Sequence, residues 1–405
     1  MSKTHEKMVP DVSRDVVACI AFAADPKLGS EAGAGASLLE AAAFYADMHE
    51  MDLVVFTRSK HVSALVGLLP SSNRCNVSVQ GVDGWTVKQL GQSMGFRLES
   101  IVWQARVWRR LAHLMREFDV KVVHHITLAS DAIPGAVHFL RSDGATTVWG
   151  PVGSSSVNLN TKGSVLWRSL RILKSVWFSI LASRVSVVVC QTDWTKKQYL
   201  FRSKALEVEQ NCSVDENILS SSRADDLDLD RGDRVVLVIG ELIDRKRPWL
   251  GCEAARFLPS KMKIVFVGDG PLRMGLEARY ADLIESGKVS FVGRKSRSEV
   301  MDMLNKSAGL LHTASREGAG WVVAEALACE KWVVTVEGSG ADTLVARVSR
   351  GGRVISDRTA TDANALARVL ISMIEKGVMP AYEGQWSPVR FRDSVSKWYS
   401  SGPAR

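Results

Sequence analysis

The fold of this chain is decided by the stretch Ser315-Arg-Glu-Gly-Ala-Gly-Trp-Val-Val-Ala-Glu-Ala-Leu327, in which a Gly-rich turn runs into an apolar helical pattern. The short apolar run before it, Gly309–Leu311, predicts a strand, so the region predicts a strand, a turn and a helix in succession. Glu317 lies in the turn, at the mouth of the helix, where backbone N–H groups can take an anion. Glu325 lies about two turns inside the helix. Two carboxylates placed in this way can hold two polyols, such as a sugar and a ribose.

The length and composition of the chain indicate two globular domains. Its 405 residues exceed the usual size of one hydrophobic core. A hydrophobic content of 46% and a charged content of 24% exclude a disordered or fibrous protein. The six cysteines show neither CxxC nor Cys/His ligand spacing, which indicates free thiols in a reducing compartment. We therefore expect no structural zinc site and no other metal centre.

No stretch of the sequence predicts a signal peptide or a membrane span. The apolar run Val16–Ala24 is too short to cross a bilayer and continues directly into Asp25-Pro26, so it predicts a first buried strand. No later stretch is both long and free of charge. We therefore expect a cytoplasmic protein, with peripheral attachment to the inner face of the membrane as an extension of that expectation.

The net charge of +8 is unevenly distributed. Basic residues dominate residues 162–204, and within them the segment 166–182 carries Arg168, Arg171 and Lys174 between apolar residues at helical spacing. Such a basic amphipathic helix can lie on an anionic membrane surface, but it can equally be a core-facing helix with a solvated basic edge. Nucleic acid is not an expected partner, because no recognised binding motif accompanies the charge.

Strand-like and helix-like segments alternate along the whole chain, which predicts parallel, doubly wound sheets covered on both faces. The predicted strands are Val16–Phe22, Leu53–Thr57, Val120–His124, Thr146–Trp149, Val185–Cys190, Arg234–Ile239, Lys263–Val267, Val289–Val292, Gly309–Leu311 and Trp332–Val336. The predicted helices include Gly35–Met48, Val87–Phe118, Ala132–Leu140, Trp249–Phe257, Leu272–Ile284, Ser298–Asn305, Val322–Ala328 and Ala341–Val348.

A polar and acidic stretch divides these elements into two halves. Residues 204–233 lack a sustained apolar period and include the acidic segment Ser220–Asp230, as a linker or exposed loop does. We predict one domain over residues 1–205 and a second over 206–384, with a C-terminal helix within 385–405 that packs back on the first domain. Ligands of such sheets bind at the carboxyl ends of the strands, near the switch points, here in a cleft between two facing domains.

The second half contains five short motifs in a characteristic order. They are Val236-Leu-Val-Ile-Gly-Glu-Leu-Ile-Asp-Arg-Lys246, Phe266-Val-Gly-Asp-Gly-Pro-Leu272, Phe291-Val-Gly-Arg294, the Glu317/Glu325 stretch, and Trp332-Val-Val-Thr335 with Gly338-Ser-Gly340. Together they resemble the nucleotide-binding domain of GT-B glycosyltransferases, specifically the retaining family 4 (glycosyl transferases group 1). The resemblance implies a GT-B fold of two Rossmann-like domains facing a central cleft. It also implies a nucleotide-diphosphate sugar as donor substrate, retention of anomeric configuration, no cofactor and no metal dependence.

The same resemblance assigns donor-side roles to named residues. The residue matching Glu317 binds hydroxyls of the donor sugar, and the residue matching Glu325 binds the ribose. Independently of the family, Lys246 can place a point charge on a diphosphate leaving group. The donor-binding candidates are Gly33, Gly35, Gly240, Arg245, Arg294, Gly318, Ala319, Gly320 and Glu325, beside Lys246, Glu317 and His125 as catalytic candidates.

One residue departs from the family pattern. An Arg usually follows the glycine that matches Gly240 and helps to hold the diphosphate, but here the residue is Glu241. A carboxylate beside a diphosphate is unfavourable. Either the register differs, or Arg245 or Arg247 takes the role of the missing cation.

The first half resembles the acceptor domain of the family more loosely. The Gly-rich segment Pro26–Gly35 follows the first strand and predicts a loop whose amides face the cleft. The pair His124-His125 and the segment Gly150-Pro-Val-Gly-Ser-Ser155 both end predicted strands. One histidine is expected in the core and the other near the reacting sugar, with no metal between them. The acceptor-side candidates are His124, Gly153 and Ser154.

The sequence thus predicts transfer of a sugar from a nucleotide-diphosphate donor to a glycan, a glycolipid or a polysaccharide precursor. Glu241 keeps open the alternative of a catalytically silent nucleotide-sugar-binding protein or partner subunit. A GT-B enzyme of another class, such as a nucleotide-sugar epimerase, is a further alternative, although the setting of Glu317 and Glu325 argues against it.

Overall fold

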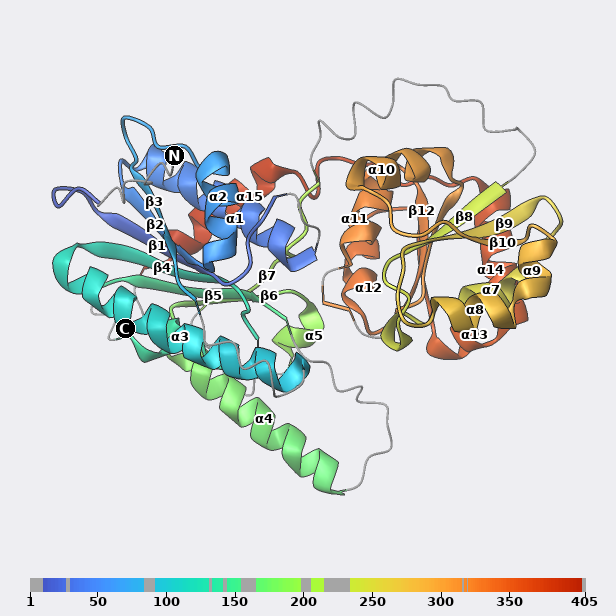
Figure 1. Ribbon diagram of the computed structural model, residues 1–405, viewed down its shortest axis with the longest axis horizontal. Helices are drawn as coiled ribbons and strands as arrows, with labels where there is room; N and C mark the ends of the chain where they lie inside the picture. Colours follow the sequence, from blue (N-terminus) through green and yellow to red (C-terminus); the bar gives the residue numbers. More distant parts are fainter. Residues whose placement is uncertain are drawn as a thin grey trace. The chain divides into compact units, whose positions relative to one another are not determined.

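A computed structural model describes residues 10–26, 30–83, 92–130, 133–140, 144–153, 165–197, 205–214, 234–314, 317–318 and 320–402. The chain divides into two compact units, each with its own sheet and core (Figure 1). Unit 1 comprises Met1–Asn211 and Pro388–Arg405, and unit 2 comprises Cys212–Ser387. The boundary thus lies six residues after the predicted one, and the returning segment begins at Pro388.

Unit 1 is built on a seven-stranded parallel sheet with the order β3-β2-β1-β4-β5-β6-β7. Its strands are β1 (Val16–Ala21), β2 (Asp52–Thr57), β3 (Val77–Gly81), β4 (Val120–Thr127), β5 (Thr146–Val152), β6 (Val187–Cys190) and β7 (Ala205–Val208). β1 is entirely buried, as expected for a strand with helices on both faces. Because β1 pairs with both β2 and β4, the chain reverses its winding direction between β1 and β4.

Helices cover both faces of this sheet. Its helices are α1 (Ser30–Met48), α2 (Ser59–Leu68), α3 (Gln92–Glu117), η1 (Ala136–Phe139), α4 (Val165–Ser183), α5 (Asp193–Lys196) and α15 (Pro388–Tyr399). One core joins the sheet to α1, α2 and α15. A second core, on the opposite face, joins it to α3, η1 and α4. No helix in the described part of the chain combines the length and the apolar character that crossing a membrane requires.

Unit 2 has a six-stranded parallel sheet with the order β10-β9-β8-β11-β12-β13. Its strands are β8 (Arg234–Ile239), β9 (Met262–Val267), β10 (Val289–Phe291), β11 (Gly309–His312), β12 (Trp332–Val336) and β13 (Gly352–Ile355). This order repeats that of unit 1 without the last strand. The switch point of unit 2 therefore lies between β8 and β11, as that of unit 1 lies between β1 and β4.

The helices of unit 2 are short. They are η2 (Asp244–Lys246), α7 (Trp249–Ala255), α8 (Arg273–Arg279), α9 (Ala281–Glu285), α10 (Arg297–Lys306), α11 (Trp321–Ala328), α12 (Gly340–Val345), α13 (Asp357–Thr361) and α14 (Ala363–Lys376). The helix predicted over Leu272–Ile284 is divided into α8 and α9 at Tyr280, whose side chain is fully buried. The predicted doubly wound α/β class is confirmed for both units.

Three strands were not predicted, and one predicted helix is wrong. The sequence patterns did not identify β3, β7 and β13, which are all edge strands of their sheets. Edge strands are partly solvated, so their apolar pattern is weak. The helix predicted over Ala132–Leu140 is wrong in the described residues, because only the short 3-10 helix η1 forms after Pro134 and Gly135. Proline and glycine both disfavour a helix interior.

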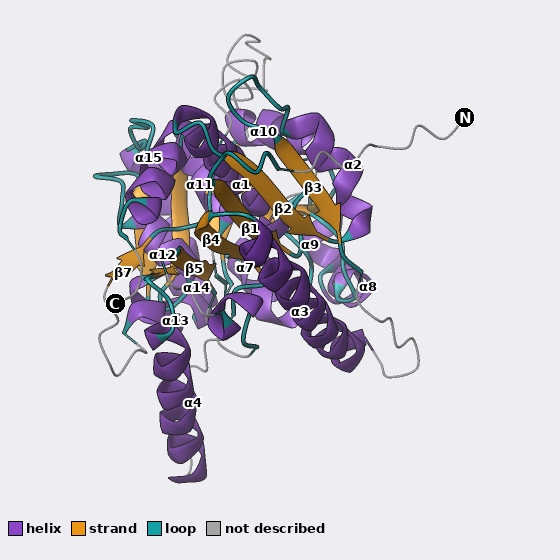
Figure 2. Ribbon diagram, turned by 90° about the vertical axis from the view of Figure 1, so that its left-hand side faces the viewer, coloured by secondary structure: helices purple, strands orange, loops and turns teal. Residues whose placement is uncertain are grey.

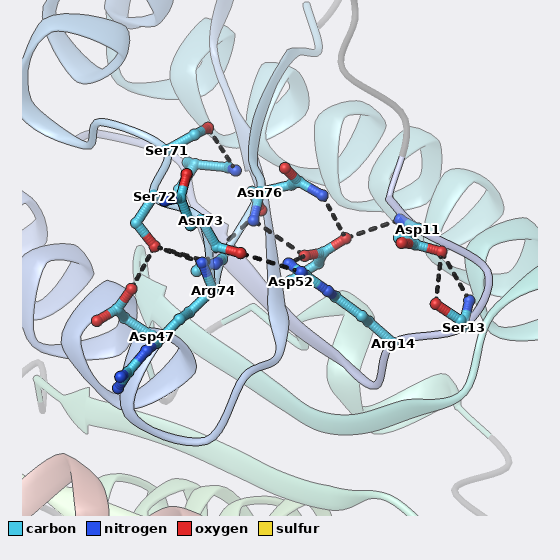
Figure 3. Close-up of polar contacts among 12 residues, drawn as sticks. Asp11, Ser13, Arg14, Asp47, Asp52, Ser71, Ser72, Asn73, Arg74 and Asn76 are labelled. Atoms are coloured by element: carbon cyan, nitrogen blue, oxygen red, sulfur yellow. Dashed lines mark hydrogen bonds and ion pairs between the residues drawn. The ribbon is translucent and has the colours of Figure 1, made fainter.

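A buried carboxylate links the segments at the amino-terminal ends of the unit 1 strands (Figure 3). Asp52, at the start of β2, is fully buried. It accepts hydrogen bonds from the backbone N–H groups of Asp11 at 2.7 Å and Asn76 at 2.9 Å, and Arg14 lies 3.5 Å away. Asp11, Arg14 and Asn76 all lie just before strands, at the end of the sheet opposite the switch point. The carboxylate is thus paired within the fold, as a buried charge must be.

Candidate functional site

The candidate site lies at the switch point of unit 2. The loop after β8 continues toward β9, and the loop after β11 continues toward β12, so the two connections leave in opposite directions from neighbouring strands. Ligands of open parallel sheets bind where this reversal opens a crevice. Lys246 lies in the first loop and Glu317 in the second, at the carboxyl ends of β8 and β11.

Gly240 brings the first loop close to Lys246. Its φ is +141°, which favours glycine, and its N–H donates to the carbonyl of Val267 at 2.9 Å. A Cβ atom at Gly240 would lie 3.3 Å from Lys246 Nζ, so the ammonium lies directly over the glycine. A small cavity beside this contact is lined by both loops, including Lys246 and His312.

Glu317 is held by two side chains, one on each of its carboxylate oxygens. Lys246 Nζ lies 2.6 Å from Oε1, and His312 Nε2 lies 2.5 Å from Oε2. His312 is in turn 3.2 Å from Thr335 Oγ1 through its other ring nitrogen, Nδ1. Burial acts to raise the pKa of Glu317, but the interactions with His312 and Lys246 outweigh it and lower the pKa. Glu317 is therefore an anionic hydrogen-bond acceptor, not a proton donor.

The backbone of the Glu317 turn is held by the start of α12. The Gly340 N–H, at the start of α12, donates to the Glu317 carbonyl at 2.7 Å. A Cβ at Gly340 would lie 1.8 Å from the carbonyl oxygen of Gly318, so any larger residue would displace the turn. Gly320, with φ +67°, begins α11. Gly318 is exposed at the turn, and the predicted donor residue Ala319 lies outside the described residues.

Glu325 has a different environment from Glu317. It lies on α11 with 8% of its surface exposed, and Arg297 Nε donates to its Oε1 at 3.1 Å. The Arg297 guanidinium also lies 5.5 Å from the centre of the Trp321 ring. Burial raises the pKa of Glu325, and the charge and hydrogen bond of Arg297 oppose that effect. Because Arg297 already pairs with Glu325, a ribose would have to share or replace that partner.

The two proposed substitutes for the missing arginine lie in different settings. Arg247, with φ +48°, donates through Nε to the carbonyl of Thr313 at 2.9 Å and pairs with Asp357. Its guanidinium therefore links the two loops of the switch point. Arg245 is exposed, as are Glu241 and, in the turn after β10, Arg294. Among the described residues, the side chains that hold Glu317 are Lys246 and His312.

Sequence reasoning gave too little weight to two residues of this site. His312 was not among the predicted site residues, yet it holds one oxygen of Glu317. Its position as the last residue of a buried strand was the available signal. Arg297 was not identified at all, because it lies 28 residues before its partner on a separate helix. No local pattern links the two.

In unit 1, the predicted donor-side glycines lie inside a helix. α1 begins at Ser30, so Gly33 and Gly35 belong to its first turns and are buried. A Cβ at Gly35 would lie 2.5 Å from the carbonyl oxygen of Ala23 and 2.7 Å from Thr127 Cγ2. The expectation of an open phosphate-facing loop is therefore wrong for Gly35, because this glycine allows α1 to pack closely on the ends of β1 and β4.

Both histidines lie within β4, which continues to Thr127 beyond the predicted end at His124, and both are core residues. His124 is fully buried, with Nδ1 2.9 Å from Tyr399 Oη and Nε2 2.8 Å from the Gly150 carbonyl. His125 is also fully buried, and its Nε2 lies 3.1 Å from the Thr127 carbonyl. Neither has exposed surface with which to touch a sugar. The structure thus corrects the expectation that His125 is catalytic and that His124 contacts the acceptor.

Burial also sets the protonation of these side chains. It lowers the pKa of His124 to about 4, against a smaller opposing effect of the Gly150 carbonyl. It lowers the pKa of His125 to about 3, assisted by the charges of His138 and His124. Both are therefore neutral at physiological pH. Gly153 lies at the end of β5, where its N–H donates to the Ala129 carbonyl at 3.1 Å, and Ser154 lies outside the described residues.

Two comparisons with known proteins place this architecture. The model of the family described as Glycosyl transferases group 1 matches residues 222–384, which lie within unit 2. No curated protein sequence matches the chain.

In the described residues, no group of three His, Cys, Asp or Glu side chains is placed to hold a metal ion.

Solved structures share the fold over nearly the whole chain. Sucrose-phosphate synthase from Thermosynechococcus elongatus is 15% identical with a TM-score of 0.65, covering 96% of this chain and 98% of its own. WaaG, a glycosyltransferase involved in lipopolysaccharide biosynthesis, is 15% identical with a TM-score of 0.61, at 94% and 98% coverage. HepE from Anabaena in complex with UDP is 15% identical with a TM-score of 0.59, at 96% and 100% coverage. The chain therefore has a GT-B fold, and residues 222–384 of its second unit match the glycosyl transferases group 1 model.

Proposed function

We propose that the protein transfers a sugar from a nucleotide-diphosphate donor to a hydroxyl group of a glycan, a glycolipid or a polysaccharide precursor. The observation that carries this proposal is the Lys246–Glu317–His312 cluster at the switch point of the group 1 domain. A cation and an anionic acceptor held side by side suit a ligand that joins a diphosphate to a polyol.

Each member of the cluster has a distinct task in this reaction. Lys246 exchanges its carboxylate partner for the diphosphate and stabilises the negative charge that develops as the bond from the anomeric carbon to the phosphate oxygen breaks. Glu317, kept ionised by its neighbours, accepts hydrogen bonds from donor-sugar hydroxyls. His312 holds the second oxygen of Glu317 and so fixes the orientation of the carboxylate.

The finer features of the reaction follow from the proposed geometry. The acceptor oxygen bonds to the anomeric carbon on the face that the diphosphate leaves and passes its proton to the departing diphosphate, so the configuration is retained. Lys246 and backbone amides supply the charge stabilisation, so no metal ion is required. We further propose that Glu325 binds the ribose hydroxyls. The complex of HepE with UDP-glucose makes uridine-diphosphate hexoses the first donors to test.

A panel of radiolabelled nucleotide sugars, incubated with the protein and a membrane extract, tests the proposal. We expect label to move from one donor to an extractable acceptor, at a rate that EDTA does not change. The anomeric configuration of the product, read by NMR, tests retention. Absence of transfer from every donor that binds would overturn the proposed activity.

One observation favours a second candidate, a catalytically silent nucleotide-sugar-binding protein. Glu241 replaces the usual Arg, and Arg247 is engaged with Thr313 and Asp357. Among the described residues, the ion pair with Glu317 at the switch point is therefore made by Lys246 and not by an arginine. A donor that raises the melting temperature without transfer or hydrolysis would select this alternative.

A further inference from the structure

One side of unit 1 carries a concentration of exposed apolar side chains. Of the twenty large hydrophobic residues exposed in the described chain, nine belong to α3, η1 and α4. These three elements pack on the same face of the unit 1 sheet. Both exposed tryptophans of the described residues, Trp108 on α3 and Trp177 on α4, are among the nine. We call the outer side of these three elements the interfacial surface.

α4 presents two unlike sides. Phe178, Leu181 and Ala182 enter the core of unit 1. On the other side, Ile172 is 61% exposed, Leu173 64% and Trp177 44%, and Ile180 continues the same row. The amino-terminal half of α4 extends beyond the other elements of unit 1 in both views (Figures 1 and 2). One side of α4 therefore belongs to the core, and the other is an exposed apolar stripe.

α3 and η1 extend this surface with an apolar cavity of about 290 Å³. Ile101 and Trp108 on α3 and Phe139 on η1 line it, and Trp108 Nε1 donates to the Phe139 carbonyl at 3.2 Å. Phe139 is itself 52% exposed. A cavity of this character takes a hydrocarbon chain in preference to a polar ligand.

Positive charge accompanies the apolar residues. Unit 1 contains 28 Lys and Arg against 19 Asp and Glu, whereas unit 2 contains 24 against 25, so the excess charge of the chain belongs to unit 1. Arg106, Arg109 and Arg110 are exposed on α3, where Arg106 donates to the carbonyl of Asp83 and Arg110 to that of Gly81. On α4, the helical positions of Arg168 and Lys174 flank the apolar stripe on either side.

The combination of positive charge and apolar area indicates what binds to the interfacial surface. Docking of a second copy through the same surface would bring basic residues against basic residues, which is repulsive. An anionic bilayer supplies both a complementary charge and an apolar interior, and tryptophan favours the boundary between them. We propose that the interfacial surface docks the protein on an anionic lipid bilayer, with the α4 stripe in the acyl region and one acyl chain in the α3–η1 cavity.

Co-sedimentation of the full chain with phosphatidylcholine vesicles, with and without phosphatidylglycerol, tests this proposal. We expect binding to the anionic vesicles that exceeds binding to neutral ones by about tenfold or more and that weakens at high salt. Protein that stays in the supernatant with anionic vesicles at low salt would overturn it.

Matched variants locate the surface. Leu173→Glu/Trp177→Glu should reduce binding to anionic vesicles at least about tenfold. Phe257→Glu/Met274→Glu introduces the same charge at exposed apolar positions of unit 2 and should change binding much less. Equal losses in the two variants would contradict the proposed location.

A charge reversal provides an independent check. Arg168→Glu/Arg171→Glu leaves the apolar stripe in place and should weaken binding to anionic vesicles while leaving residual binding to neutral ones unchanged. Analytical ultracentrifugation without lipid tests the other occupant. A dimer that Leu173→Glu/Trp177→Glu dissociates would show that a second copy covers the surface and would overturn the bilayer proposal.

Discussion

The two switch points of this molecule are built on the same strand order and are filled in opposite ways. In unit 2, the loops after β8 and β11 bring Lys246 and Glu317 together beside a small cavity. In unit 1, the corresponding ends of β1 and β4 are covered by Gly35 of α1, and the Thr127 hydroxyl bonds the backbone of Ala23 at 3.0 Å. The same topology therefore supports either a charged site or a packed core.

The difference lies in which side chains reach the strand ends. The Glu31 carboxylate of unit 1 accepts the N–H of Leu128 at 2.6 Å, so an internal anion satisfies the amide at this position. The Glu317 carboxylate of unit 2 has only side-chain partners on its two oxygens in the described residues, Lys246 and His312. Side-chain partners can be exchanged for a ligand at less cost than backbone ones. A shared fold thus does not imply a shared function.

The largest effect that this comparison predicts is on catalysis in unit 2. Lys246→Ala should lower kcat by about 100-fold or more, because removal of one preorganised charge at the leaving group costs roughly 3 kcal/mol. Steady-state transfer kinetics measure it, with Arg245→Ala as the matched control for a neighbouring exposed cation. If kcat is unchanged in Lys246→Ala and falls in Arg245→Ala, the diphosphate role belongs to Arg245.

A somewhat smaller effect is expected on donor affinity. Glu325→Ala should raise the donor Kd by roughly 10- to 100-fold, because ribose hydroxyls lose a charged acceptor. Isothermal titration calorimetry measures it, with the exposed helical Glu375→Ala as control. Arg297→Ala separates two explanations. If Glu325 acts only by holding Arg297, Arg297→Ala will weaken the donor equally; if it binds ribose, Arg297→Ala will not.

The packed switch point of unit 1 predicts an effect on stability. Gly35→Ala should destabilise unit 1 by about 1–3 kcal/mol, because the new methyl group overlaps the Ala23 carbonyl and the Thr127 side chain. Gly67→Ala, in α2, has no atom within 4 Å of the new Cβ and should be neutral or slightly stabilising. Hydrogen exchange of β1 and β4 measures the difference. Equal protection in the two variants would show that the strand ends can separate to admit the methyl group.

The smallest expected effect, counted for each buried histidine, is on the free energy of unfolding at acidic pH. Burial lowers the folded-state pKa of His124 and His138 to about 4, below the ordinary value of 6.5. Stability is therefore full above pH 6.5 and falls as the pH drops toward the folded-state pKa, since the unfolded chain binds protons first. Between pH 7.5 and 5.5 the loss is about 1.4 kcal/mol per histidine.

Hydrogen exchange at the two pH values, corrected for intrinsic rates, measures this loss strand by strand. β4 and β5 of unit 1 should lose more protection than β9 and β12 of unit 2. A uniform loss across both units would contradict the assignment of the effect to the buried histidines.

Much of the fold followed from sequence patterns. β8 and β12 begin and end where their β-branched runs predicted. The patterns were weaker at the solvated edges, where β3, β7 and β13 were not predicted. Periodicity reports burial, so it identifies central strands better than edge strands. It also placed the start of α1 too late, because a helix that packs closely on the ends of β1 and β4 needs Gly35 in its first turns.

The residues of the site were likewise predicted only in part. The order of five motifs was sufficient to select Lys246, Glu317 and Glu325 from the sequence. It could not show that His124 and His125 are core residues, because a histidine at a strand end is compatible with either a buried or an exposed ring. It could not find Arg297 either, since the contact with Glu325 depends on how α10 packs beside α11.

The sequence by itself therefore determined the class of fold, the location of the donor-side motifs and the basic character of the first unit. These depend on local spacing and composition, which the chain carries directly. Tertiary structure alone decided that Glu317 is shared between Lys246 and His312, that Gly35 closes the other switch point, and that one side of α4 remains exposed. Each of these depends on contacts between segments far apart in the chain, and no local pattern encodes such contacts.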